Sequence, residues 1–98
     1  MPVKMIIPTP LRQYTGKKDI VELQAKTVGE ALSGLTRQYD ELHKHLFTDD
    51  GKLRSFVNIY VNDEDIRYLQ KEATSLRDND VISIVPSIAG GLLRPLQL

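Results

Sequence analysis

The sequence contains no cysteine, no excess of charge of either sign and no long apolar run. Without cysteine there are no disulfides, thiolate nucleophiles or cysteine-ligated metals, and a reducing compartment is expected. Thirteen basic and thirteen acidic side chains give zero net charge, so no overall field favours nucleic acid or an anionic membrane. No segment nears the roughly 20 apolar residues that span a bilayer, and "MPVKMIIPTP" does not resemble a signal peptide. We expect a cytoplasmic protein that binds neither nucleic acid nor membrane.

Motifs for catalysis and metal binding are also missing. There is no phosphate-binding glycine loop and no nucleophile with a matching base. His43 and His45, two residues apart on an expected helix, point to different sides of it. The segment that begins at Asp78 lacks the central glycine and closing glutamate of a calcium loop. We therefore expect no enzymatic activity, no bound cofactor and no metal.

What is present is one domain with one hydrophobic core. The chain has 98 residues, of which 41% are hydrophobic, enough for a single modest core. Val3, Met5 and Ile7 alternate with other residues as in a strand, which the prolines of residues 8–10 end. Residues 11–18 have the composition of a loop, and the alternating residues 21–25 predict a second strand that forms a hairpin with the first.

A long helix is predicted after this hairpin. "TVGE" is a capping box, in which the Thr27 hydroxyl accepts from the Glu30 amide and the Glu30 carboxylate reaches back. The turn residues 48–52 end the helix. Apolar residues at spacings of three and four form its buried stripe: Val28, Leu32, Leu35, Tyr39, Leu42 and Leu46.

The second half of the sequence predicts three strands. They cover residues 56–62, a short edge segment at 66–69, and residues 81–85, and turns at 62–65 and 77–80 separate them. Asn79 is expected in the left-handed conformation. The order of elements predicts an α+β fold, a mixed sheet of four to five strands with one helix packed across one face.

A single helix leaves the other face of the sheet open. Alternation places Phe56, Tyr60, Ser83 and Val85 there, with Ile88 near its end, and a partly apolar exposed face is typical of a docking surface. The alternatives are that scattered apolar side chains on the surface have no function, or that Phe56 and Ile88 belong to the core.

The sequence closes with "SIVPSIAGGLLRPLQL". Pro86 ends strand pairing and stiffens the exit of the chain. Gly90 and Gly91 have no Cβ, so this segment is able to thread a narrow channel. By spacing alone, two adjacent glycines are usually a turn or a flexible connection.

Three segments resemble a known family. "LRDNDVISIVPSIAGG", residues 76–91, is similar to the closing signature of the ThiS/MoaD sulfur carriers. "IPTPLRQYTG" at 7–16 and "FVNIYVNDEDIRYLQ" at 56–70 resemble the CysO-like branch of cysteine biosynthesis. The resemblance implies a ubiquitin-like β-grasp fold, with first and last strands side by side. It divides the chain into a β-grasp domain with the start of a stem at 1–89, a functional Gly-Gly terminus at 90–91 and an extension at 92–98.

The resemblance also implies a function. A ThiF/MoeB-type partner would use ATP to adenylate the Gly91 carboxylate, and a sulfur donor would convert it to a thiocarboxylate. The stem of Ile88, Ala89 and Gly90 would enter the partner's active site. In the CysO-like branch the acceptor would be an activated serine on a pyridoxal-phosphate cysteine synthase, and a zinc metallohydrolase would release cysteine. The alternatives are a carrier for molybdopterin or thiamine synthesis, a modifier conjugated to lysines, and a β-grasp binding module.

Two features depart from the family pattern. Family carriers usually end at the second glycine, whereas Leu92–Leu98, "LLRPLQL", follow here, and an amide at Gly91 is not a substrate for adenylation. We therefore expect a processing protease, of the metalloprotease type, to cut between Gly91 and Leu92. Asn79 replaces a glycine common in its turn, and asparagine tolerates the same backbone conformation.

Overall fold

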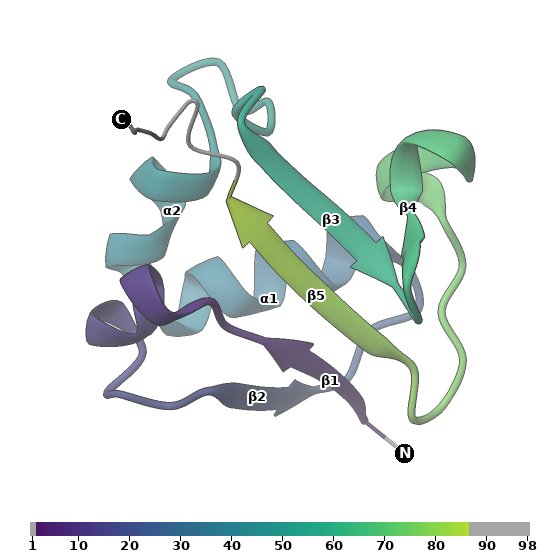
Figure 1. Cartoon of the computed structure of the whole chain (residues 1–98), viewed down its shortest axis with the longest axis horizontal. Coiled ribbons are helices and arrows are strands. Elements are labelled where there is room, and N and C mark those ends of the chain that lie inside the picture. Colours follow the sequence, from purple (N-terminus) through teal and green to yellow (C-terminus); the bar gives the residue numbers. More distant parts are fainter. Residues whose placement is uncertain (1, 87–98) are drawn as a thin grey trace, which may run out of the picture.

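The last strand of the described residues lies in the middle of the sheet (Figure 1). The computed structural model describes residues 2–86, and within them β5 (Val81–Pro86) pairs in parallel with β1 (Val3–Ile6) and antiparallel with β3 (Val57–Val61). β2 (Ile20–Leu23) flanks β1, and the two-residue β4 (Glu64–Asp65) flanks β3, giving the order β2-β1-β5-β3-β4. The predicted hairpin and the α+β, ubiquitin-like β-grasp fold are confirmed.

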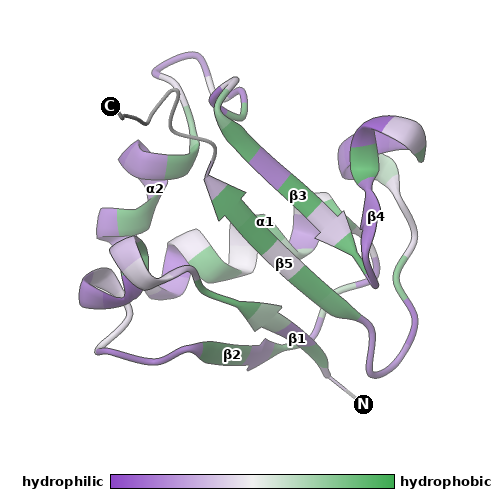
Figure 2. Ribbon diagram, in the orientation of Figure 1, coloured by the Kyte–Doolittle hydropathy of each residue, from purple (hydrophilic) through white to green (hydrophobic). Residues whose placement is uncertain are grey.

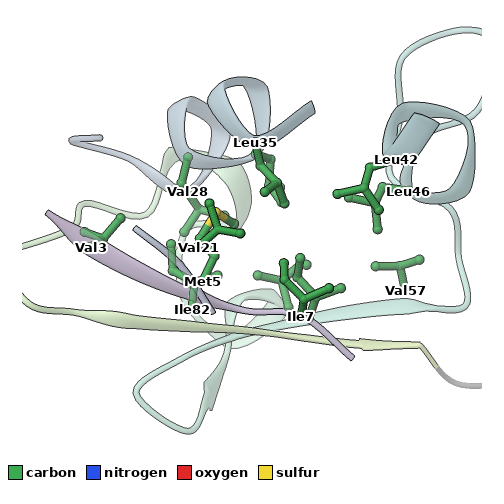
Figure 3. Close-up of a cluster of buried hydrophobic side chains, with 14 of the residues drawn as sticks. Val3, Met5, Ile7, Val21, Val28, Leu35, Leu42, Leu46, Val57 and Ile82 are labelled. Carbon is green, nitrogen blue, oxygen red and sulfur yellow. The ribbon is translucent and has the colours of Figure 1, made fainter. Parts of the chain in front are cut away.

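Two helices, α1 (Val28–Gln38) and α2 (Asp40–Leu46), cover one face of the sheet (Figures 1 and 3). The first of the two hydrogen bonds predicted for the capping box of α1 is present: Thr27 Oγ1 accepts from the Glu30 amide at 3.2 Å. The Glu30 carboxylate reaches one residue further back than a capping box requires, to the Lys26 amide at 2.9 Å.

The predicted single helix is divided at Tyr39, where φ is −129° and ψ is 86°. The apolar spacing continues across this break, so the pattern alone gives no sign of it. Asp40 and Glu41 then occupy the first turn of α2, where carboxylates interact favourably with the helix dipole. The break directs α2 onto the segment before β2, where the ring of His45 stacks on Tyr14, with centroids 4.4 Å apart.

The core lies between the sheet and the helices. Figure 3 shows strand side chains such as Met5, Ile82 and Val57 directed toward Leu35, Leu42 and Leu46 of the helices. Strict alternation in the strands produces this face: β3 and β5 each bury every second residue. Apart from Tyr39, which is partly buried, the helical stripe is fully buried as predicted, at Val28, Leu32, Leu35, Leu42 and Leu46.

Two segments differ from the sequence expectation. Residues 66–69 do not form an edge strand: β4 ends at Asp65, and Ile66–Tyr68 is a 3-10 helix (η2), whose first turn is capped by the Asp65 carboxylate at the Arg67 amide, 2.9 Å away. A second 3-10 helix (η1), Thr9–Tyr14, occupies the first half of the predicted loop 11–18. Its second residue is Pro10, in the first turn, where the helix does not need the missing N–H. A third, η3 (Lys71–Ala73), precedes the last turn.

The predicted turns are present. Asn79 has φ of 68°, the left-handed conformation expected from the sequence, in the turn before β5. Asn62 and Asp63 also have positive φ, 49° and 75°, which is typical of a two-residue hairpin turn between β3 and β4.

Candidate functional site

A row of side chains crosses the open face of the sheet from β2 to β3. The strand register pairs Ile20 with Ile6, Ile6 with Ser83, and Ser83 with Tyr60. Ile20 and Ile6 are exposed, and Ser83 and Tyr60 are half-buried. These four residues therefore form one continuous strip on the side opposite the helices.

Three of the predicted docking residues lie on this face. Tyr60 and Ser83 are directly opposite each other, and Val85, 42% exposed, pairs with Asn58 one step closer to the end of β5. Ile6 and Ile20 were not among the predicted docking residues. Their alternation with buried neighbours indicates exposure, but only the parallel β1–β5 register shows that Ile6 lies beside Ser83.

Phe56 was predicted to lie within a strand, on the open face of the sheet. It lies one residue before β3, in a turn, and is 45% exposed, so it is not part of the core. It lines a hollow of about 450 Å³ at the end of β5, where Val57 pairs with Pro86. The other lining residues come from η1, α2 and the segment before β3: Pro10, Leu11, Lys44, His45 and Arg54.

His45 contributes an unusual buried atom to this region. Its Nε2 is buried and has no hydrogen-bond partner among the described residues. A buried polar group without a partner costs on the order of 1–3 kcal/mol, so this position is locally unfavourable.

A second hollow, of about 420 Å³, lies beside β3 and β4. One wall contains the ion pair between Asp65 and Arg67, in which Nη2 and Nε of the guanidinium lie 2.7 and 3.1 Å from Oδ2. The side-chain hydrogen bonds from Arg67, with a further one from its backbone amide, lower the pKa of Asp65 below its ordinary value of 3.8. The same hydrogen bonds raise the pKa of Arg67.

The stem and terminus predicted from the sequence, Ile88, Ala89, Gly90, Gly91 and Leu92, lie outside the described residues. Within residues 2–86, no group of three or more metal-ligating side chains is gathered. In the same part of the chain, no helix has the length and apolar character needed to cross a membrane.

Comparison with known proteins identifies the family. The model of the ThiS family matches residues 5–91. The chain belongs to the ThiS family. The match ends at Gly91, so residues 92–98 lie beyond it.

Individual relatives of this ThiS-family chain agree in sequence and in fold. The sulfur carrier protein CysO of Mycobacterium tuberculosis is 42% identical over 93 residues, which cover 93% of this chain and all of CysO. Its crystal structure superposes with a TM-score of 0.80 at 40% identity, covering 88% of this chain and 99% of that one.

Two further relatives bear on partners and on alternative functions. CysO from Amycolatopsis orientalis, solved as a BexX/CysO complex, has a TM-score of 0.82 at 36% identity and covers 91% of this chain and 99% of that one. Small archaeal modifier protein 3 of Haloferax volcanii is 37% identical over 82% of this chain and 88% of its own length.

Proposed function

We propose that this ThiS-family protein is a sulfur carrier whose processed C-terminal Gly91 is adenylated, converted to a thiocarboxylate and used as a sulfur donor in cysteine biosynthesis. The observation that supports this most is the 42% identity to CysO over the whole of that protein. We infer a cytoplasmic site of action, where ATP is available to the activating partner.

The chemistry explains why the carrier itself needs no catalytic residues. A carboxylate is a poor electrophile, so an activating enzyme first lets a Gly91 oxygen attack the α-phosphate of ATP, releasing pyrophosphate. A sulfide equivalent from the sulfur donor then attacks the acyl carbon, and AMP leaves with the bridging oxygen. The sulfur of the resulting thiocarboxylate then replaces the leaving group of an activated serine derivative on a pyridoxal-phosphate cysteine synthase, which gives a thioester. The carrier contributes a recognisable surface and a terminus.

The architecture suits a tail that acts at a distance from its domain. β5 ends at Pro86, five residues before Gly91. Five extended residues reach at most about 18 Å, enough for a terminus to enter a partner's active site while the domain docks outside. The open face with Tyr60, Ser83 and Val85 adjoins Pro86 and is the docking surface that we propose for the adenylating enzyme, and Phe56 lies near it in the hollow at the end of β5.

Processing has to precede activation. Residues 92–98 follow Gly91, which is therefore an amide in the full chain and not a substrate for adenylation. We propose that a metalloprotease cuts between Gly91 and Leu92. A metallohydrolase of this kind also suits the later step. Once the acyl group has moved from the sulfur of the thioester to the cysteine amine, hydrolysis of the resulting amide releases cysteine and regenerates the Gly91 carboxylate.

The second candidate function is protein modification. The likeness to small archaeal modifier protein 3 favours it, because an activated Gly91 is open to attack by a lysine amine as well as by sulfide. The two functions share adenylation and differ in the final acceptor.

Mass spectrometry of the protein from its native host tests both. A sulfur carrier gives a species ending at Gly91 in which one oxygen is replaced by sulfur. A modifier gives branched peptides in which a lysine of another protein carries a segment that ends at Gly91; trypsin leaves residues 78–91 on the lysine, because Arg77 is the last basic residue before the glycines. If every molecule retains residues 92–98, neither proposal stands.

A further inference from the structure

Arg54 is held in a fixed position at the end of α2. Its Nε donates to the Lys44 carbonyl at 2.8 Å, and its backbone amide donates to the Leu46 carbonyl at 2.9 Å. Both acceptors belong to the last turn of the helix, where carbonyls lack partners within the helix and favour a cation. The guanidinium is therefore oriented by the fold.

The outer end of this guanidinium has no partner in the part of the chain that the structure describes. Within residues 2–86, neither Nη1 nor Nη2 of Arg54 has a hydrogen-bond or ion-pair acceptor. A planar guanidinium fixed at Nε presents its remaining N–H groups as a fork that matches the two oxygens of a carboxylate. Arg67, by contrast, has its fork occupied by Asp65.

Arg54 borders two hollows of the surface. Arg54 and Val57 line both the hollow at the end of β5 and the hollow beside β4. The other residues that line the hollow at the end of β5 are mainly apolar. They include Pro86 and Phe56, which is 45% exposed. The hollow beside β4 has Leu53, Ile59 and Ile66 among its lining residues.

The charge around these hollows is positive, although the chain as a whole is neutral. Only two acidic side chains line them, Asp65 and Glu72, and Asp65 is already paired. The basic side chains that line them number five: Lys44, Lys52, Arg54, Arg67 and Lys71. An acidic segment is therefore attracted to this surface, and a basic one is repelled.

We propose that this surface, the Arg54 cleft, binds an extended segment of a partner protein that carries one carboxylate with an apolar side chain two residues before it and another two residues after it. Alternate residues of an extended segment lie on one face, so the carboxylate meets the Arg54 fork while the apolar side chains enter the two hollows. Because the cleft adjoins Pro86, the partner is an enzyme that acts on the C-terminal tail, and this part of the inference rests on the proposed function.

The first test needs no enzyme. Acetyl-Leu-Ser-Glu-Ser-Leu-amide and the matched peptide with Gln in place of Glu are titrated into the ¹⁵N-labelled full chain. We expect the Glu peptide to shift the Arg54 Nε–H signal and the amides of residues 53–59, with roughly 10-fold tighter binding than the Gln peptide. Equal shifts from both peptides, or none from the Glu peptide, would overturn the proposal.

The second test uses the adenylating enzyme of the same organism with the chain ending at Gly91. Calorimetry should show binding weakened about 10-fold to 100-fold by Arg54→Gln and by at least about 5-fold by Arg54→Lys, which keeps the charge but loses the fork. Arg37→Gln, at an exposed arginine on α1, should bind like the wild type. Wild-type affinity for both Arg54 variants would sink the inference.

The two tests separate this inference from the carrier function. Failure of the unsubstituted chain ending at Gly91 to be adenylated contradicts the proposed function, and the peptide titration is unaffected by that result. Normal adenylation of the wild type together with unchanged Arg54 variants contradicts the Arg54 cleft alone. Thermal melting of each variant confirms that it is folded before binding is measured.

Discussion

Asn62 Nδ2 donates a hydrogen bond of 2.9 Å to Asp80 Oδ1, which joins the turn after β3 to the turn before β5. Asn62 Oδ1 also accepts from the Val81 amide at 3.0 Å, and Asp80 Oδ2 accepts from the Arg77 amide at 2.8 Å. The two side chains thus fix the point at which β5 enters the sheet, and with it the register of the strand that ends at Pro86.

Asp80→Ala should lower the free energy of unfolding by about 1–2 kcal/mol, because it removes one side-chain and one backbone partner in a partly exposed network. Urea unfolding measures this, with Asp49→Ala in the exposed turn at 48–52 as the control. Identical midpoints for the wild type and both variants would show that the Asn62–Asp80 link does not stabilise the fold.

His45→Phe should raise the free energy of unfolding by roughly 1 kcal/mol, because it removes the unpartnered buried Nε2 and keeps a ring stacked on Tyr14. His45→Ala is the matched variant. It loses the stacking as well, and should be less stable than His45→Phe. A phenylalanine variant that melts below the wild type would mean that Nε2 has a partner in solution.

Asp65→Asn should make stability less dependent on pH in acid. The Arg67 hydrogen bonds lower the pKa of Asp65 in the folded state below 3.8, so the pair stabilises the fold above that pH. This contribution is lost as the pH falls through the lowered folded pKa. Denaturant unfolding at pH 7, 5 and 3 should show a difference between wild type and variant that is constant at the first two values and shrinks at pH 3. A difference that does not change with pH would contradict the assigned pKa shift.

Asn79→Gly should leave stability nearly unchanged, whereas Asn79→Ala should lose about 1 kcal/mol, because alanine tolerates a φ of 68° poorly. Comparison of the two melting curves measures the cost of the left-handed conformation directly. Equal losses in both variants would indicate that the asparagine side chain, and not the backbone, is what matters.

Val85→Arg tests the open sheet face. Because Val85 is exposed, the change should alter stability by less than about 0.5 kcal/mol. It should raise the KM for the carrier in adenylation about 10-fold or more with kcat retained. Ser33→Arg, on the exposed side of α1, is the control and should have no effect. Equal KM values would exclude this face as the docking surface.

Much of the fold could be predicted because the residue pattern that specifies a helix or a strand lies within that helix or strand. The Thr27 cap, the stripe from Val28 to Leu35 and the alternation in residues 57–61 each follow from local spacing, and all are present. The break at Tyr39 could not be predicted, since the spacing is continuous there and the change of direction depends on packing against η1.

The site was predictable in part, for a related reason. Alternation shows which residues of a strand face outward, and it placed Tyr60, Ser83 and Val85 correctly. It does not give the register between strands distant in sequence, so Ile6 and Ile20 were missed. The free fork of Arg54 depends on contacts with a helix ten residues away, which no local pattern contains. The role that we propose for Gly91 rests on the family and not on spacing.

The place of β5 has a consequence for the order of synthesis. The strand made last is the one that β1 and β3 both need as a neighbour, so a chain that stops before residue 81 leaves two half-sheets with open edges. Only a chain translated through Pro86 supplies the strand that joins β1 to β3, so the described sheet becomes continuous only when its last residues have been made.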